Sequence, residues 1–101
     1  MRFLAIERDV PGVHDDQYYP HLRAEAERAW ELYQSGVVRE LYFRADREAA
    51  VLVMECGSSG EAEAFLATLP LVHEGLIRFD VIPLRPYPGF QRLFAGSGMS
   101  R

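Results

Sequence analysis

The sequence places one arginine where it could bind a small anion. Arg39 lies in a stretch rich in Val, Leu, Tyr and Phe, and strand alternation predicts that its guanidinium shares a face with Leu41 and Met54. A guanidinium removed from water must find an acceptor, and a carboxylate can accept two parallel hydrogen bonds from it. The acceptor is either a substrate carboxylate or an internal one such as Glu31 or Glu74.

Three aromatic residues accompany Arg39 in this candidate substrate site. Trp30 and Tyr33 fall on the apolar face of a helix that precedes Arg39, and Tyr42 follows it by three residues. We expect Trp30, Tyr33 and Tyr42 to line a pocket in which Arg39 holds the charged group of a small molecule.

The candidate proton carriers are Glu40 and His73, with Glu55 and Asp80 as further carboxylates of the same kind. A carboxylate kept partly from water has its pKa raised toward neutrality, so it can take and return a proton. A histidine needs little tuning for the same role near pH 7. The alternative is that the carboxylates pair with nearby arginines and that His73 is an exposed loop residue.

Metal ions and cofactors are not expected. His14, Asp15, Asp16 and His21 are of metal-ligating types, but their spacing fits neither a helical nor a knuckle pattern of ligands. Cys56 is the only cysteine and is predicted to lie in the core rather than to act as a nucleophile. No Gly-rich phosphate loop and no Ser-His-Asp pattern is visible.

The elements that must position these residues follow the order βαββαβ. Residues 20–35 and about 59–69 have helical periodicity, with Gly36 as a C-cap and Ser58 with Glu61 as a capping box. Strands are predicted at residues 2–8, 37–44, 49–56 and 76–84. This order predicts an α+β, ferredoxin-like domain, in which two helices cover one face of an antiparallel four-stranded sheet.

The predicted hairpin strands have two different faces. If Arg44 opposes Ala49, one face is apolar except for Arg39, which then lies across from Met54. The other face mixes apolar with charged residues, among them Val38, Glu40, Tyr42, Val51, Val53 and Glu55. Such a face is too apolar for open water, so we expect a second copy of the chain to cover it in a dimeric α+β barrel.

Length, net charge and cysteine content favour a small cytoplasmic protein. The chain has 101 residues and a formal net charge of -4, which provides no basic surface for nucleic acid or an anionic membrane. A single cysteine fits a reducing compartment, and no apolar run is long enough to span a membrane. We expect one domain over residues 1–88 and a tail over residues 89–101.

Through one set of residues, the chain resembles a known family, the muconolactone isomerases. The residues that carry the resemblance are Gly36, Arg39, Leu41, Ala45, Glu55, Leu69-Pro70-Leu71, Ile77, Asp80 and Pro86. The resemblance implies a ferredoxin-like fold, dimeric α+β barrels within larger homo-oligomers, and cofactor-free proton transfer within an unsaturated lactone that bears a carboxylate. That family carries basic side chains where this chain has Leu4 and Ile6, and a histidine in place of Glu40.

The resulting hypothesis is an isomerase that acts on a small unsaturated or cyclic carboxylic acid or lactone of aromatic catabolism. Arg39 would anchor the anion, and Glu40 or His73 would move the proton. Two alternatives remain open. One is a cofactor-independent monooxygenase or cyclase of an aromatic pathway, and the other is a non-catalytic protein that binds a small ligand or serves assembly.

Overall fold

The computed structural model describes residues 1–94. Its elements are, in chain order, β1 (Arg2–Asp9), α1 (Leu22–Gln34), β2 (Val38–Phe43), β3 (Ala50–Glu55), α2 (Ser59–Leu66), α3 (Pro70–His73) and β4 (Ile77–Leu84). Short 3-10 turns precede α1 and follow β4. The predicted βαββαβ order is confirmed, and α3 is an additional short helix.

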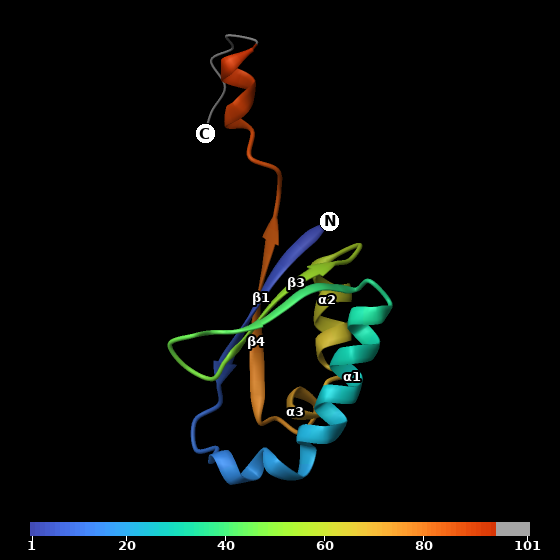
Figure 1. The fold of residues 1–101 in the computed structure, drawn as a ribbon, viewed down its shortest axis with the longest axis vertical. Helices are drawn as coiled ribbons and strands as arrows, with labels where there is room; N and C mark the ends of the chain where they lie inside the picture. The colour runs from blue at the N-terminus through green and yellow to red at the C-terminus, as the bar shows by residue number, and fades with distance from the viewer. Residues whose placement is uncertain (95–101) are drawn as a thin grey trace.

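The four strands form one antiparallel sheet in the order β2-β3-β1-β4. This order places β1 and β3 in the centre and leaves β2 and β4 as the two edges. All three helices lie on the same side of the sheet (Figure 1). The α+β, ferredoxin-like fold is therefore confirmed, and one face of the sheet is left without a helix.

The helix ends follow local chemistry. Gly36 adopts a φ of 86° just after α1, a left-handed conformation that glycine reaches without steric cost. The Ser58 hydroxyl accepts a hydrogen bond from the Glu61 backbone N–H at 3.1 Å and caps α2, as the spacing predicts. The second helix ends at Leu66 rather than near Leu69, because Pro70 starts the separate helix α3.

The register of the β2–β3 hairpin is confirmed near the loop and differs at the far end. Phe43 opposes Ala50, and Leu41 opposes Leu52, as predicted. The register then shifts between Val38 and Glu40, so that Val38, not Arg39, faces Met54. The predicted pairing of Arg39 with Met54 is wrong, because an irregularity gives the buried position to the apolar Val38 and leaves Arg39 exposed.

The two faces of the sheet differ in character as predicted, but Val38, which was expected on the mixed face, lies in the core. The face beneath the helices holds the core, where Phe3 and Met54 are fully buried. On the other face Glu40 pairs with Val53, and Arg8 donates a hydrogen bond to Asp80 at 2.6 Å. That uncovered face is thus a mixture of apolar strand residues and ion pairs. The dimeric barrel that would cover it stays a prediction.

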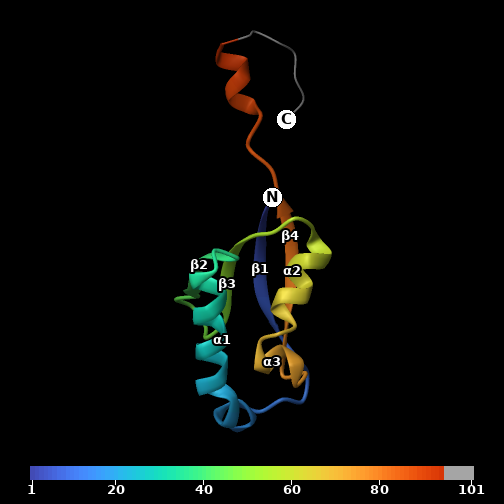
Figure 2. The same cartoon turned by 90° about the vertical axis from the view of Figure 1, so that its right-hand side faces the viewer.

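After β4 the chain forms an arm, residues 85–94, that leaves the domain (Figure 2). Its large apolar side chains lie open to solvent, and Phe94 is 87% exposed. The Tyr87 ring packs edge-on against Phe90 and lies over Gly89, where a Cβ atom would come within 2.0 Å of the Tyr87 hydroxyl oxygen. Residues 95–101, the rest of the predicted tail, lie outside the described part of the chain.

Candidate functional site

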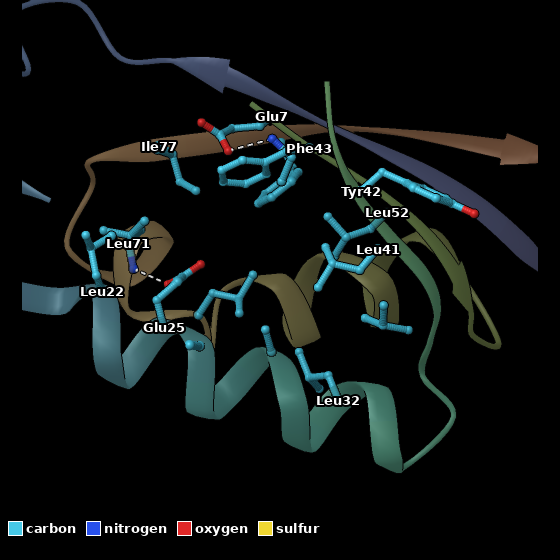
Figure 3. Close-up of a pocket in the computed structure, with 16 residues that line it drawn as sticks. Glu7, Leu22, Glu25, Leu32, Leu41, Tyr42, Phe43, Leu52, Leu71 and Ile77 are labelled. Carbon is cyan, nitrogen blue, oxygen red and sulfur yellow. Dashed lines mark hydrogen bonds between the residues drawn. The ribbon is translucent and has the colours of Figure 1, made fainter. Parts of the chain in front are cut away.

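A cavity of about 370 Å³ lies between α1 and the helix-covered face of the sheet (Figure 3). Short side chains create it, because Ala26 and Ala29 of α1 and Ala50 of β3 leave the space between the helix and the sheet unfilled. The exposed side chains of Leu22 and Phe43 mark its mouth. A volume of this size suits a ligand built on a single ring.

Glu7 contributes the first of two carboxyl groups to the cavity. It follows Phe3 and Ala5 at a spacing of two on β1, so the strand turns its side chain toward the helices. Its Oε1 accepts a hydrogen bond from the Ala50 backbone N–H at 2.9 Å. Burial raises the pKa of Glu7, and this hydrogen bond and the charge of Arg47 offset part of the rise.

Glu25 contributes the second carboxyl group from the first turn of α1. It lies four residues before Ala29 and therefore on the helix face that looks at the sheet. Its Oε1 accepts a hydrogen bond from the Leu71 backbone N–H at 2.9 Å. Burial raises the pKa of Glu25, and the negative charge of Glu7 raises it further, whereas His21 lowers it.

The two carboxyl groups can divide acid and base roles between them. Each is fixed by one backbone hydrogen bond and keeps its second oxygen for a ligand. Burial, and to a smaller extent the charge on Glu7, disfavour ionisation of Glu25, so Glu25 keeps its proton to a higher pH than an exposed glutamate does. Carboxyl groups whose pKa values are raised by burial are a typical feature of sites for general acid–base catalysis.

Five of the six site residues predicted from the sequence come together, but they line an open groove and not an enclosed pocket. Trp30, Tyr33, Arg39, Glu40 and Tyr42 line an open groove between α1 and the edge strand β2. The rings of Trp30 and Tyr33 stack with centroids 5.8 Å apart, yet 57% of Trp30 remains exposed. The groove adjoins the cavity, since both are lined in part by Leu41 and Ala29.

Arg39 is not the buried guanidinium that the sequence predicts. Its Nε donates a hydrogen bond to the Gly36 carbonyl at 2.7 Å, at the C-terminal end of α1, and not to Glu31 or Glu74. Glu40 accepts a hydrogen bond from the Tyr42 hydroxyl at 2.8 Å. The roles of Arg39, Tyr42 and Glu40 toward a substrate stay predictions.

His73 lies apart from both the cavity and the groove. It ends α3, with its side chain 76% exposed and its Nδ1 3.8 Å from the Glu74 carboxylate. Neither set of lining residues includes it. The alternative of an exposed histidine at this position describes the structure better than a catalytic one.

The other carboxylates proposed as proton carriers form ion pairs on the uncovered face. Glu55 binds the amino group of Met1, which holds its pKa below the usual value, the opposite of the expected shift. Asp80 pairs with Arg8, in line with the alternative that these carboxylates pair with arginines. Cys56 is buried, as predicted, and burial raises the pKa of its thiol.

Glu7 and Glu25 were not among the residues predicted from the sequence, although the sequence contains a signal for each. Glu7 occupies an inward position in the alternation that starts at Phe3, and Glu25 occupies an inward position in the helical repeat that includes Ala29. A charged residue at an inward position is costly without a partner, so it often marks a functional site.

Residues 1–94 contain neither a cluster of metal-ligating side chains nor a helix that could span a membrane. No group of three or more His, Cys, Asp or Glu side chains in this range could hold a metal ion. Within the same residues, no helix has the length and apolar character needed to cross a membrane.

A ferredoxin-like α+β domain with a ligand-sized cavity between helix and sheet is the class of protein that this geometry defines. The chain matches the muconolactone delta-isomerase family over residues 1–89 and belongs to that family. The resemblance inferred from the sequence is thereby confirmed. Among curated proteins, none matches the chain.

Two solved structures share the fold. A crystal structure of muconolactone isomerase matches with a TM-score of 0.71 at 22% identity, over 100% of this chain and 98% of that one. The 5-chloro-2-hydroxyhydroquinone dehydrochlorinase of Burkholderia phenoliruptrix, in complex with 2,5-dihydroxybenzoquinone, matches with a TM-score of 0.66 at 19% identity, over 88% of this chain and 98% of that one. At these identities the likeness shows the fold alone.

Proposed function

We propose that the chain is a cofactor-free enzyme of muconolactone isomerase type, which moves a proton within a small unsaturated or cyclic lactone or related acid of aromatic catabolism. One observation carries the proposal: Glu7 and Glu25, both with raised pKa values, line a cavity whose remaining walls are almost entirely apolar. Membership of the family supports the reaction class.

The proposed mechanism uses the two carboxyl groups in turn. The Glu7 carboxylate removes a proton from a carbon next to the ligand carbonyl, and that C–H electron pair moves into the ring as an enolate. Protonated Glu25 donates a hydrogen bond to the enolate oxygen while the charge develops there. Glu7 then returns the proton to a different ring carbon, so no oxidant or reductant is needed.

A deuterium experiment tests the proposal. Unsaturated lactones and cyclic enones are incubated with the chain in D₂O, and deuterium incorporation and double-bond migration are followed by NMR. Glu7→Gln should lower the exchange rate on the order of 10²- to 10⁴-fold, because the amide can still accept the Ala50 hydrogen bond but cannot take a proton. Glu27→Gln is the control, since Glu27 pairs with Arg23 on the surface of α1.

Two results would contradict this proposal. One is an absence of exchange in every substrate of the panel, which would favour the non-catalytic ligand-binding alternative. The other is oxygen consumption with a quinol, which would favour the cofactor-independent monooxygenase.

A second candidate places a carboxylate-bearing substrate in the open groove. The observation that favours it is the convergence of Arg39, Glu40 and three aromatic side chains on one surface. There the guanidinium would hold the carboxylate and Glu40 would move the proton. This candidate requires activity to depend on Arg39.

We also propose that the chain works in the cytoplasm as a homodimer or a larger homo-oligomer. Half-buried Leu4 and Ile6 give the uncovered sheet face an apolar character, and Phe90, Leu93 and Phe94 of the arm are exposed. Apolar surface of this extent favours coverage by a second copy. The single, buried Cys56 fits a reducing compartment.

A further inference from the structure

The charges that line the cavity are all of one kind. Of the sixteen lining residues, two are glutamates, one is Tyr42, and the other thirteen are apolar. The lining contains no arginine and no histidine, and the chain has no lysine at all. A ligand in this cavity therefore meets two carboxyl groups and no positive side chain.

The cations that act on the two glutamates, or that line the neighbouring groove, do not line the cavity. Arg47 influences Glu7 from a distance, but its guanidinium donates a hydrogen bond to Asp9 at 2.9 Å. Arg39 lines only the groove and bonds to the Gly36 carbonyl. His21 acts on Glu25 through its charge and does not line the cavity.

A carboxylate ligand would be unfavourable in such a space for two reasons. It would lose its hydration shell against apolar walls, and it would lie beside Glu7, which carries the same charge. An uncharged hydroxyl or carbonyl group avoids both the loss of a hydration shell around a charge and the repulsion by Glu7. A hydroxyl can donate a hydrogen bond to an ionised carboxylate, and a carbonyl can accept one from a protonated carboxyl group.

We infer that the cavity selects uncharged ring compounds bearing hydroxyl or carbonyl oxygens and rejects carboxylates of the same size. The inference rests on the proposed function, since it names the substrate class of that same cavity. It narrows the substrates of that function to the uncharged lactones and excludes the related acids as anions. It also differs from the second candidate, whose carboxylate substrate requires a cation. The selecting residues are Glu7 and Glu25, and the apolar walls set the size of the ring.

A matched pair of probes tests this selection. 4-Hydroxybenzamide and 4-hydroxybenzoate have nearly the same shape, but only the second is an anion at pH 7. Each is titrated into the ¹⁵N-labelled full chain, and the Ala50 and Leu71 amides serve as reporters because they donate to Glu7 and Glu25. The amide should shift both signals and bind at least tenfold more tightly than the benzoate.

Two variants connect the preference to the carboxyl groups. The double variant Glu7→Gln, Glu25→Gln should reduce the preference to less than threefold, because the fixed negative charge is gone while both backbone hydrogen bonds can still form. Glu27→Gln should leave the preference unchanged. Preserved dispersion of the amide spectrum shows that each variant is folded.

The outcomes separate this inference from the proposed function. Benzoate that binds as tightly as the benzamide, with the same two amides shifted, overturns the selection of uncharged ligands and leaves the proton-transfer proposal intact. Selective binding of the benzamide, without deuterium exchange in the substrate panel, supports the selection and contradicts the enzyme. If neither probe moves the Ala50 and Leu71 signals at millimolar concentration, the selection of uncharged ring compounds is overturned, and the proton-transfer proposal is decided by the deuterium exchange experiment alone.

Discussion

The cavity and the groove lie side by side on the same helix, yet they offer opposite chemistry. The cavity is apolar, enclosed by α1 and the sheet, and holds two carboxyl groups whose pKa values are raised. The groove is open, and its charged side chains, Arg39 and Glu40, are exposed. The difference teaches that burial, more than residue type, decides which charged groups are prepared for proton transfer.

The largest effect that separates the two regions should come from their glutamates. Glu25→Gln should slow deuterium exchange by about 10²-fold, because the amide is a weaker hydrogen-bond donor to a developing enolate than the carboxylic acid. Glu40→Gln should change the rate by less than about twofold, since Glu40 lies in the groove. The measurement is initial exchange rate by NMR, and the reverse ranking of the two variants would move the chemistry to the groove.

A second prediction concerns stability and pH. Burial raises the pKa of Glu25 in the folded chain, so between its ordinary value of 4.5 and the raised value the folded state binds more protons than the unfolded state. The free energy of unfolding then falls as pH rises through that window. Glu25→Gln cannot ionise, so it should raise the Tm at pH 7 relative to the unaltered chain and leave it nearly unchanged at pH 4.

Glu27→Gln serves as the control for this prediction, because Glu27 is an exposed residue of the same helix. Its Tm should follow that of the unaltered chain at both pH values. A Glu25→Gln variant that is less stable at pH 7 than at pH 4, compared with the unaltered chain, would contradict the assigned shift.

Much of the fold could be predicted from the sequence, because local rules determine it. Alternation and helical periodicity located the strands and helices, and Gly36 and Ser58 marked two helix ends. The short helix α3 was not predicted, although Pro70 suits the first turn of a helix.

The site was harder to predict because it depends on tertiary detail. A one-residue irregularity in β2 moved Arg39 out of the core, and counting along an ideal strand cannot detect such a shift. Glu7 and Glu25 are far apart in sequence, and only the packing of α1 on the sheet brings them to one cavity. The groove residues, by contrast, are close neighbours on α1 and β2, which is why the sequence grouped them correctly.

A third, smaller effect is expected from the arm, and it tests whether the cavity depends on self-association. We expect that truncation after Pro88 weakens self-association by about tenfold, because it removes the exposed side chains of Phe90, Leu93 and Phe94. Sedimentation velocity over a concentration series measures the change. The rate of deuterium exchange per folded chain should be retained if the cavity is complete within one chain. An unchanged sedimentation coefficient would count against the role of the arm in self-association.

The smallest effect is expected at the residue that the sequence favoured most. Arg39→Ala removes a hydrogen bond to the Gly36 carbonyl at the end of α1, which should lower the free energy of unfolding by about 0.5–1 kcal/mol. It should leave the KM for an uncharged substrate within about twofold, because Arg39 does not line the cavity. Urea unfolding and steady-state exchange kinetics measure the two quantities separately. A KM that rises tenfold or more, with Arg39→Lys restoring part of the loss, would assign the substrate to the groove and make Arg39 its anchor, as the second candidate requires.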